Sequence, residues 1–371
     1  MSTPPTQPPG SPVRPPAAPA RPAPQGSAAP AAPQRAGGGF APAARAISPG
    51  DLERSGAIVS TITKVFQSRV VGQENLRLSL LTALAAGGHV LLESVPGLAK
   101  TTAASALASS ITGSFARIQC TPDLMPNDII GTQIFNYGSG TFTTQLGPVH
   151  ANVVLLDEIN RSSAKTQSAM LEAMQEKQTT IGGKRFELPR PFLVMATQNP
   201  IEQEGTYQLP EAQLDRFMIK DLLTHPNPNE EVEILSRLDS GVFDKDSVPD
   251  PACTLDDVVT MQSYARTVYI DPAITRYLVE LVHSTRNTTK YLGRFAPFIE
   301  YGASPRASIA FTNAGRALAM IRGRNYVIPE DIKDLAHRVL AHRIQLNFEA
   351  AAENITSAQI VDALLMAVPT P

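Results

Sequence analysis

The stretch that decides the fold is residues 91–102, which read LLESVPGLAKTT. Apolar residues lead into a Pro-Gly pair, a Lys-Thr pair follows, and a run of small residues begins at Thr102. This order predicts a strand, a loop and a helix. Such a loop turns backbone N–H groups inward above a helix N-terminus, which makes an anion site. Lys100 suits the outer phosphates of a nucleotide and Thr101 suits Mg²⁺, so we interpret the stretch as a phosphate loop.

The loop departs from the common GxxxxGK[ST] pattern. Ser94 stands at the first glycine position and Ala99 at the second, while Pro96 and Gly97 shape the turn. A strand–helix turn with an exposed lysine remains an alternative for this stretch alone. The interpretation therefore depends on partner residues elsewhere in the chain.

Composition limits the classes of protein. The chain has 371 residues, of which 43% are hydrophobic, enough for two domains with cores of their own. The net charge of -2 gives no strong attraction to nucleic acid or anionic membranes. Cys120 and Cys253 lack metal-ligand spacing, and we interpret them as buried thiols. No apolar run approaches the roughly 20 residues that span a bilayer, and the N-terminus has no apolar signal region, so we expect a cytoplasmic protein.

Residues 1–49 are rich in Pro, Ala, Gly and Ser and contain no acidic residue. Such a segment cannot bury enough apolar surface to offset the entropy lost on ordering. We therefore predict a disordered N-terminal tail. A solubilising role and a partner-docking role both remain open for it.

A second chemical signal follows the aliphatic run at residues 152–156, which predicts a central parallel strand. Asp157 and Glu158 come directly after it, and ligands bind at this carboxyl end in open α/β sheets. Asp157 can hold Mg²⁺ through its water shell, and Glu158 can polarise an attacking water. An Asp-Glu pair at a strand end can also cap a helix.

Two further segments are suited to a nucleotide site. The buried strand predicted at 192–197 delivers Asn199 to the edge that carries Asp157, where an amide can orient water; an asparagine before a proline is also a common turn residue. Val71 and Gly72, before a helix at 74–86, could form an apolar shelf for adenine, or a turn that links two helices. Turn signals predict hairpins at about 133–145 and 178–188. Residues 115–120 predict a further strand, and Thr121 to Asp123 predict the cap of a short helix that runs to Ile130.

Together these motifs resemble a MoxR-type AAA+ ATPase of the clade with a helix-2 insert, which includes magnesium chelatase ATPase subunits and minichromosome maintenance helicases. The two predicted hairpins match the insert hairpins of that clade. The resemblance covers about Gly50 to the C-terminus. The motifs that carry it are residues 72–73, 95–101, 121–124, 157–161, 195–200 and 209–217.

The resemblance implies roles for individual residues. Lys100 and Thr101 match Walker A, and Asp157 and Glu158 match Walker B. The implied catalytic set is Glu158, Asn199 as sensor 1, Arg216 as an arginine finger for the neighbouring subunit, and Arg306 as sensor 2. The implied ATP-binding set is Val71, Gly72, Pro96, Gly97, Leu98, Ala99, Lys100, Thr101, Thr102 and Asp157, with Thr101 and Asp157 serving the Mg²⁺ ion. Arg161 would either face the neighbour or form a surface salt bridge.

A helical lid follows the nucleotide domain. The breaker cluster at 225–228 predicts a boundary between an αβα core with a parallel sheet at 50–225 and an all-α lid at 226–371. Ser304 and Pro305 start a lid helix, which places Arg306 in its first turn. A cation there opposes the helix dipole and needs an anionic partner. Nucleotide phosphate or a nearby carboxylate could supply it.

For function, the resemblance implies a homo-oligomeric ring, a hexamer, that uses ATP and Mg²⁺ to remodel or mature a client protein. The work implied is chaperone-like and includes metal-cofactor insertion, often with a partner that carries a von Willebrand factor A-type domain. The alternatives are a chelatase subunit, a nucleic-acid motor, and a scaffold that binds nucleotide without turnover. The net charge gives little basis for tracking phosphates, so we expect no nucleic-acid partner.

Overall fold

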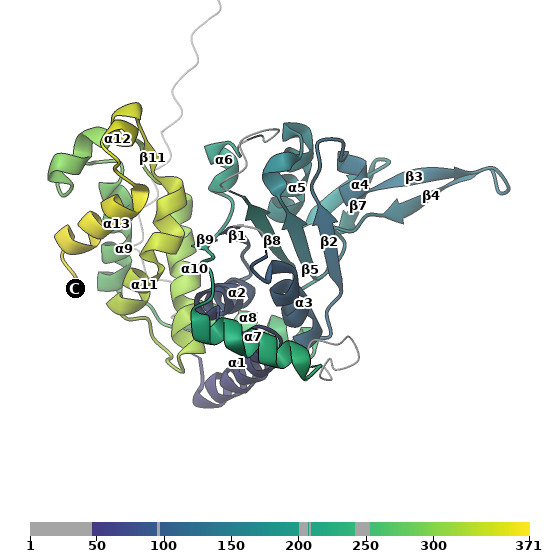
Figure 1. Cartoon of the computed structure of the whole chain (residues 1–371), viewed down its shortest axis with the longest axis horizontal. Coiled ribbons are helices and arrows are strands. Elements are labelled where there is room, and N and C mark those ends of the chain that lie inside the picture. Colours follow the sequence, from purple (N-terminus) through teal and green to yellow (C-terminus); the bar gives the residue numbers. More distant parts are fainter. Residues whose placement is uncertain (1–46, 95–96, 200–206, 208, 242–252) are drawn as a thin grey trace, which may run out of the picture. The chain divides into compact units, whose positions relative to one another are not determined.

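The computed structural model describes residues 47–94, 97–199, 207, 209–241 and 253–371 (Figure 1). Its main sheet has five parallel strands in the order β2-β5-β8-β1-β9. Their bounds are β1 Val90–Glu93, β2 Phe115–Gln119, β5 Val153–Asp157, β8 Leu193–Gln198 and β9 Ile219–Leu222. The sequence predicts all of these strands except β9. The predicted tail, apart from its last three residues, lies outside the described residues, as do Val95 and Pro96.

Helices cover both faces of this sheet. Successive strand residues point to opposite sides, and both sides carry apolar side chains that must be buried. Val90 and Leu92 belong to one hydrophobic cluster and Leu91, between them, to another. The helices of the first cluster include α1 Pro49–Arg69, α2 Glu74–Ala86 and α3 Lys100–Ser110, and those of the second are α4 Pro126–Ile130 and α5 Ala164–Glu176. The predicted αβα arrangement is confirmed.

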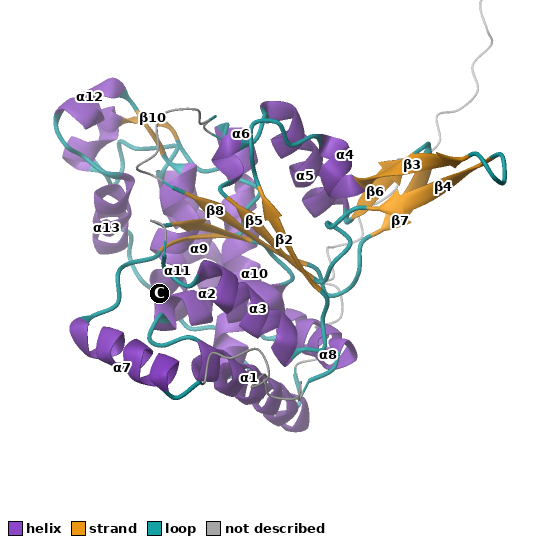
Figure 2. Cartoon of the chain, turned by 45° about the vertical axis from the view of Figure 1, so that its right-hand side comes forward, coloured by secondary structure: helices purple, strands orange, loops and turns teal. Residues whose placement is uncertain are grey.

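Two antiparallel hairpins leave this core at the predicted places. The first pairs β3 (Gly131–Asn136) with β4 (Thr141–Leu146), and the second pairs β6 (Gln178–Ile181) with β7 (Lys184–Glu187). The β3–β4 hairpin extends away from the sheet and its helices (Figure 2). Most of its apolar side chains therefore stay exposed.

The second half of the described chain is mainly helical, as predicted. The sequence does not predict its last helices or a small β10–β11 sheet. The remaining elements are η1 Ile159–Arg161, α6 Glu211–Leu214, α7 Pro228–Asp239, α8 Leu255–Thr267, α9 Pro272–Ser284, η3 Gly293–Phe298, β10 Ile299–Tyr301, α10 Pro305–Ile321, α11 Pro329–Leu340, η4 Ala341–Arg343, β11 Gln345–Leu346, α12 Phe348–Ala352 and α13 Ser357–Ala367.

Helices α8 and α10 pack against α1 and α2, so a single hydrophobic cluster crosses the boundary predicted near residue 226. The predicted start of α10 is confirmed, since the Ser304 hydroxyl accepts a hydrogen bond from the Arg306 N–H. The division into a core at 50–225 and a lid at 226–371 stays a prediction. Among the described helices, none is long and apolar enough to cross a membrane.

One predicted helix start is wrong. Thr121 to Asp123 do not cap a helix that runs to Ile130, because α4 begins only at Pro126. Its first turn is closed by Asp128, whose carboxylate accepts a hydrogen bond from the Met125 N–H at 2.9 Å. The proline at the first helical position fixes this later start.

A buried histidine ties α5 to the sheet. His89 accepts a hydrogen bond at Nδ1 from the Val194 N–H (3.1 Å), and its Nε2 lies 3.3 Å from the Met174 carbonyl oxygen. Its ring meets the edge of Phe192 at a centroid distance of 5.5 Å. Burial lowers the pKa of His89 to about 4, and the charge of Lys177 acts in the same direction. The imidazole is therefore neutral at pH 7.

This burial predicts a pH-dependent stability. Below pH 6.5 an unfolded histidine binds a proton that folded His89 does not bind until about pH 4, so the unfolding free energy falls as pH drops through this window. The loss from His89 between pH 7.5 and pH 5 should be about 2 kcal/mol. Urea unfolding of the wild type and of His89→Gln at both pH values measures it. The variant should show the shallower dependence, and equal slopes would contradict the assignment.

Candidate functional site

Three neighbouring strands deliver the predicted nucleotide-binding groups to one edge of the sheet. Strand β8 lies between β1 and β5, and all three run parallel. The phosphate loop follows β1, Glu158 follows β5, and Asn199 follows β8. Because the carboxyl ends of parallel strands share an edge, segments about 100 residues apart in the chain converge there.

The phosphate loop has the backbone that an anion site needs. Gly97 (φ 89°) and Ala99 (φ 53°) are left-handed, and α3 begins directly afterwards at Lys100. A Cβ atom built on Gly97 meets no other atom within 4 Å, which leaves open space above the turn. Pro96, a predicted binding residue, lies outside the described residues, whereas Leu98 is buried beneath the loop.

Ser94, the residue at the first glycine position, is buried at the start of this loop. Its N–H donates to the Gln198 carbonyl oxygen at 3.0 Å, which continues the pairing of β1 with β8. Its hydroxyl is buried and has no hydrogen-bond partner among the described residues. A small side chain fits this position, and Ser94 anchors the loop to the neighbouring strand.

The residues at the start of α3 fit a nucleotide with its metal ion. Lys100 Nζ lies 3.9 Å from Asp157 Oδ1, and both side chains are largely buried. Thr101 and Thr102 stand in the first turn of α3, where backbone N–H groups favour phosphate. The Thr101 hydroxyl and the Asp157 carboxylate are oxygen ligands of the kind that Mg²⁺ takes. The chemistry of this donor set therefore suits ATP with Mg²⁺.

The Asp157 carboxylate is held by side chains from both neighbouring strands. Thr197 on β8 donates to Oδ1 at 2.9 Å, and Arg117 on β2 donates to Oδ2 at 2.6 Å. No local motif in the sequence points to these two residues as partners of Asp157. The register β2–β5–β8, which brings them beside Asp157, is a property of the sheet.

Glu158 adopts a left-handed backbone (φ 58°) directly after β5. Its N–H donates to the Thr197 hydroxyl at 2.8 Å, and its carboxylate accepts from Gln119 Nε2 at 3.1 Å. Arg161 Nε lies 3.2 Å from the same carboxylate, so Arg161 forms an ion pair within its own chain. Glu158 makes no capping hydrogen bond to η1, which argues against a mere capping role.

Three further predicted residues are Asn199, Gly72 and Val71. Asn199 is buried directly after β8, at the edge that carries Asp157. Gly72 (φ 63°) lies in a turn that links α1 to α2, and a Cβ atom there would meet the Glu230 carboxylate at 2.4 Å. Val71 is buried beside it. The segment therefore forms a turn that links two helices, and a role of Val71 and Gly72 in adenine binding stays a prediction.

Arg216 and Arg306 lie elsewhere, at the opposite edge of the sheet. Together with His89 they line a cavity of about 250 Å³. His89 directly precedes β1, and Ser94, at the start of the phosphate loop, directly follows β1. Five residues of extended chain span roughly 16 Å. That distance is longer than an arginine side chain, so Arg216 and Arg306 do not reach the phosphate loop of their own chain.

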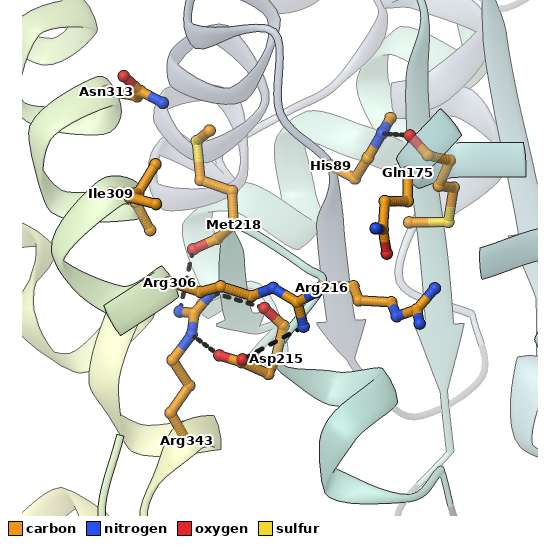
Figure 3. Close-up of a pocket in the computed structure, with 11 residues that line it drawn as sticks. His89, Gln175, Asp215, Arg216, Met218, Arg306, Ile309, Asn313 and Arg343 are labelled. Carbon is orange, nitrogen blue, oxygen red and sulfur yellow. Dashed lines mark hydrogen bonds and ion pairs between the residues drawn. The ribbon is translucent and has the colours of Figure 1, made fainter. Parts of the chain in front are cut away.

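Arg306 therefore does not lie beside Lys100 of its own chain. Its Nη1 atom lies 3.6 Å from Asp215 Oδ2, so a nearby carboxylate is the anionic partner. Asp215 lies between Arg306 and Arg343, while the Arg216 side chain extends away from them (Figure 3). The sequence signals that identify Arg216 and Arg306 say nothing about Asp215 or Arg343.

Comparison with known proteins identifies two matching family models. Residues 89–219 match the ATPase family associated with various cellular activities (AAA). Residues 293–364 match the AAA lid domain. These segments contain the phosphate loop, both carboxylates and both arginines, in the order that the sequence analysis expects.

Individual relatives cover nearly the whole chain. Chaperone MoxR1 of Mycobacterium tuberculosis is 44% identical over 342 residues, which are 91% of this chain and 90% of that protein. Protein MoxR of Methylorubrum extorquens is 29% identical over 322 residues, 81% of this chain and 90% of the relative. A crystal structure of a Cytophaga hutchinsonii protein, 44% identical, superposes with a TM-score of 0.82 over 87% of this chain and 97% of the other. The chain therefore belongs to the MoxR family of AAA ATPases and hydrolyses ATP.

Proposed function

We propose that this ATPase forms a homo-hexameric ring, and that the ring remodels or matures client proteins. ATP would bind at the edge that carries Lys100 and Asp157, and the next subunit would complete the site with Arg216 and Arg306. The name of the relative Chaperone MoxR1 supports the chaperone class of work. Metal-cofactor insertion, a partner with a von Willebrand factor A-type domain, and the cytoplasmic location stay predictions.

One observation carries the proposal. Lys100, Asp157 and Glu158 lie at the carboxyl edge of the sheet, and Arg216 and Arg306 lie at its amino edge. Within one chain the length of a strand separates the two groups, and this distance is longer than an arginine side chain. A neighbouring copy can bring both groups to one nucleotide in a head-to-tail contact. Repeated head-to-tail contacts form a ring when the rotation between neighbours closes, as we propose here.

The residues at this site divide the chemistry between them. Lys100 and the N–H groups of α3 would bind the phosphates, while Thr101 and Asp157 would hold Mg²⁺, whose charge offsets theirs. Glu158 would take up the proton of the attacking water, and Asn199 would orient that water. Arg216 of the next subunit would offset the charge that develops on the transferred phosphoryl group.

The β3–β4 hairpin supports a protein client over a nucleic acid. Residues 131–147 contain no charged residue, so this arm offers no cation to a phosphate backbone. Its exposed side chains include Tyr137 (91% exposed) and Phe142 (65%). Exposed apolar groups of this kind mark sites of protein contact. A chelatase ATPase subunit remains the second candidate, favoured by a 25% identical magnesium-chelatase subunit ChlI homolog of Methanocaldococcus jannaschii over 54% of this chain.

Glu158→Gln should separate binding from turnover. Removing the carboxylate should leave the Kd for ATP within about threefold of wild type but reduce kcat by about 10²–10⁴-fold, the range for a general base. Fluorescent-nucleotide titration and steady-state phosphate release measure the two quantities. Glu349→Gln, at an exposed position of α12, is the matched control and should behave like wild type. Equal losses of binding and turnover would contradict the role of Glu158.

Arg216→Ala and Lys100→Ala should each abolish most hydrolysis and restore part of it when mixed. Each variant keeps the half of the site that the other lacks, so mixed rings contain some complete sites. An arginine finger is typically worth about 10³–10⁵ in rate, which makes even partial rescue measurable as phosphate release.

The control for this experiment uses two residues of the same half-site. A mixture of Arg216→Ala with Arg306→Ala should show no rescue, and the exposed Arg276→Ala should hydrolyse ATP like wild type. If mixed rings form and the Arg216→Ala and Lys100→Ala pair shows no gain, a shared site is excluded.

A further inference from the structure

Arg343 makes several hydrogen bonds to the loop that carries Arg216, and His342 beside it contacts the Phe217 carbonyl oxygen at 3.3 Å. Arg343 ends η4, and only 2% of its side chain is exposed. Its Nε donates to Asp215 Oδ1 at 2.8 Å, and its Nη2 donates to the carbonyl oxygens of Phe217 (2.6 Å) and Asp215 (3.2 Å). One guanidinium therefore binds the backbone on both sides of Arg216.

The remaining bonds of Arg343 also stay within the protein. Its Nη1 donates to the carbonyl oxygen of Val339 and, at 3.4 Å, to that of Met218. Burial lowers the pKa of Arg343, and the neighbouring Asp215 carboxylate opposes that effect. A guanidinium is buried at this cost only where several acceptors compensate it. Its bonding geometry suits holding a loop in place, not binding a ligand.

Asp215 extends the same network to the second arginine of the edge. Its Oδ2 accepts a hydrogen bond from the Ser304 hydroxyl at 2.7 Å and lies 3.6 Å from Arg306 Nη1. Ser304 caps the helix whose first turn carries Arg306. Figure 3 shows Asp215 between Arg306 and Arg343. One carboxylate thus links the start of α10 and the end of η4 to the Arg216 loop.

Arg216 itself has few fixed contacts. Its Nη1 donates to the Leu171 carbonyl oxygen at 3.3 Å. Its Nε is buried without a hydrogen-bond partner among the described residues. The side chain is therefore weakly held, and its position depends mainly on the backbone that Arg343 binds.

We propose that Arg343 is a positioning residue for ATP hydrolysis at the neighbouring subunit's site. It binds residues 215–218 to the lid, so that Arg216, Arg306 and the lid move as one body. This inference rests on the proposed shared site. In a ring, the lid of one subunit would then control whether the next subunit's nucleotide receives its arginines.

Arg343→Lys tests the inference. A lysine keeps a cation beside Asp215, but its single ammonium cannot bond the carboxylate and two carbonyls in the fixed geometry of a guanidinium. Small misplacements of a catalytic group can cost about 10²-fold. We expect kcat to fall by about 10- to 100-fold while the Kd for ATP stays within about twofold. If the Tm of this variant is too low for the assay, the double variant R343M/D215N replaces it. This pair removes both charges, and the same fall in kcat at an unchanged Kd is expected.

Arg338→Lys is the matched control. Arg338 lies on α11, immediately before η4, and also joins the lid to the core, through Asn75 (2.8 Å) and Asp221 (3.5 Å). It does not contact the Arg216 loop in the described structure. If Arg343 only attached the lid to the core, Arg338→Lys and Arg343→Lys should lose equal amounts of turnover. The positioning role predicts near-wild-type turnover for Arg338→Lys.

Mixed rings distinguish which half of the site is damaged. Arg343→Lys subunits should regain hydrolysis when mixed with Lys100→Ala subunits and should not regain it with Arg216→Ala subunits. Rescue by Arg216→Ala, a parallel rise in the Kd for ATP, or an equal loss in Arg338→Lys would overturn the role of Arg343 alone. Failure of the Arg216→Ala and Lys100→Ala pair would overturn the shared site and this inference with it.

Discussion

In a parallel sheet all strands begin at one edge and end at the opposite edge. The arrangement of the charged groups in this protein depends on that constraint. Loops after β1, β5 and β8 gather Lys100 and the two carboxylates at one edge. The segment before β9 carries Arg216 at the other edge, and Met218 bonds to the His89 carbonyl oxygen there. The strands are short, but they are longer than any side chain. In the proposed ring, a second copy supplies Arg216 and Arg306.

The lid contributes to both edges through packing. Helices α8 and α10 share one hydrophobic cluster with α1, α2 and α3, the helix that carries Lys100. The Arg343 network joins the lid to the Arg216 loop by polar contacts. Closely packed interiors transmit displacement instead of absorbing it. In the proposed ring, a change at the nucleotide would therefore have a physical route to the arginines that serve the next site.

Local sequence signals predicted most of the fold. The aliphatic runs became buried strands, and the turns at residues 138–140 and 182–183 became hairpins, because these signals act over a few residues. The wrong helix start at Thr121 has a local cause too, since Pro126 supplied a competing start that the sequence analysis overlooked. The last helices do have local start signals, Asn347 at α12 and the capping box of Thr356 with Gln359 at α13, so their sequence made them predictable. Strand β9 depends more on its pairing with β1 than on a local signal.

The sequence by itself determined the chemical types at the site: a lysine after a glycine-containing loop, two carboxylates after a buried strand, and an amide after the next strand. Only the tertiary structure decided how these groups are held and which of them meet. Thr197 and Arg117 reach Asp157 through the strand register, and Asp215 and Arg343 meet across 128 residues of chain. No local pattern encodes such contacts, because they follow from the packing of segments that are distant in sequence. For the same reason the structure, and not the motif, placed Arg306 beside Asp215 and away from Lys100.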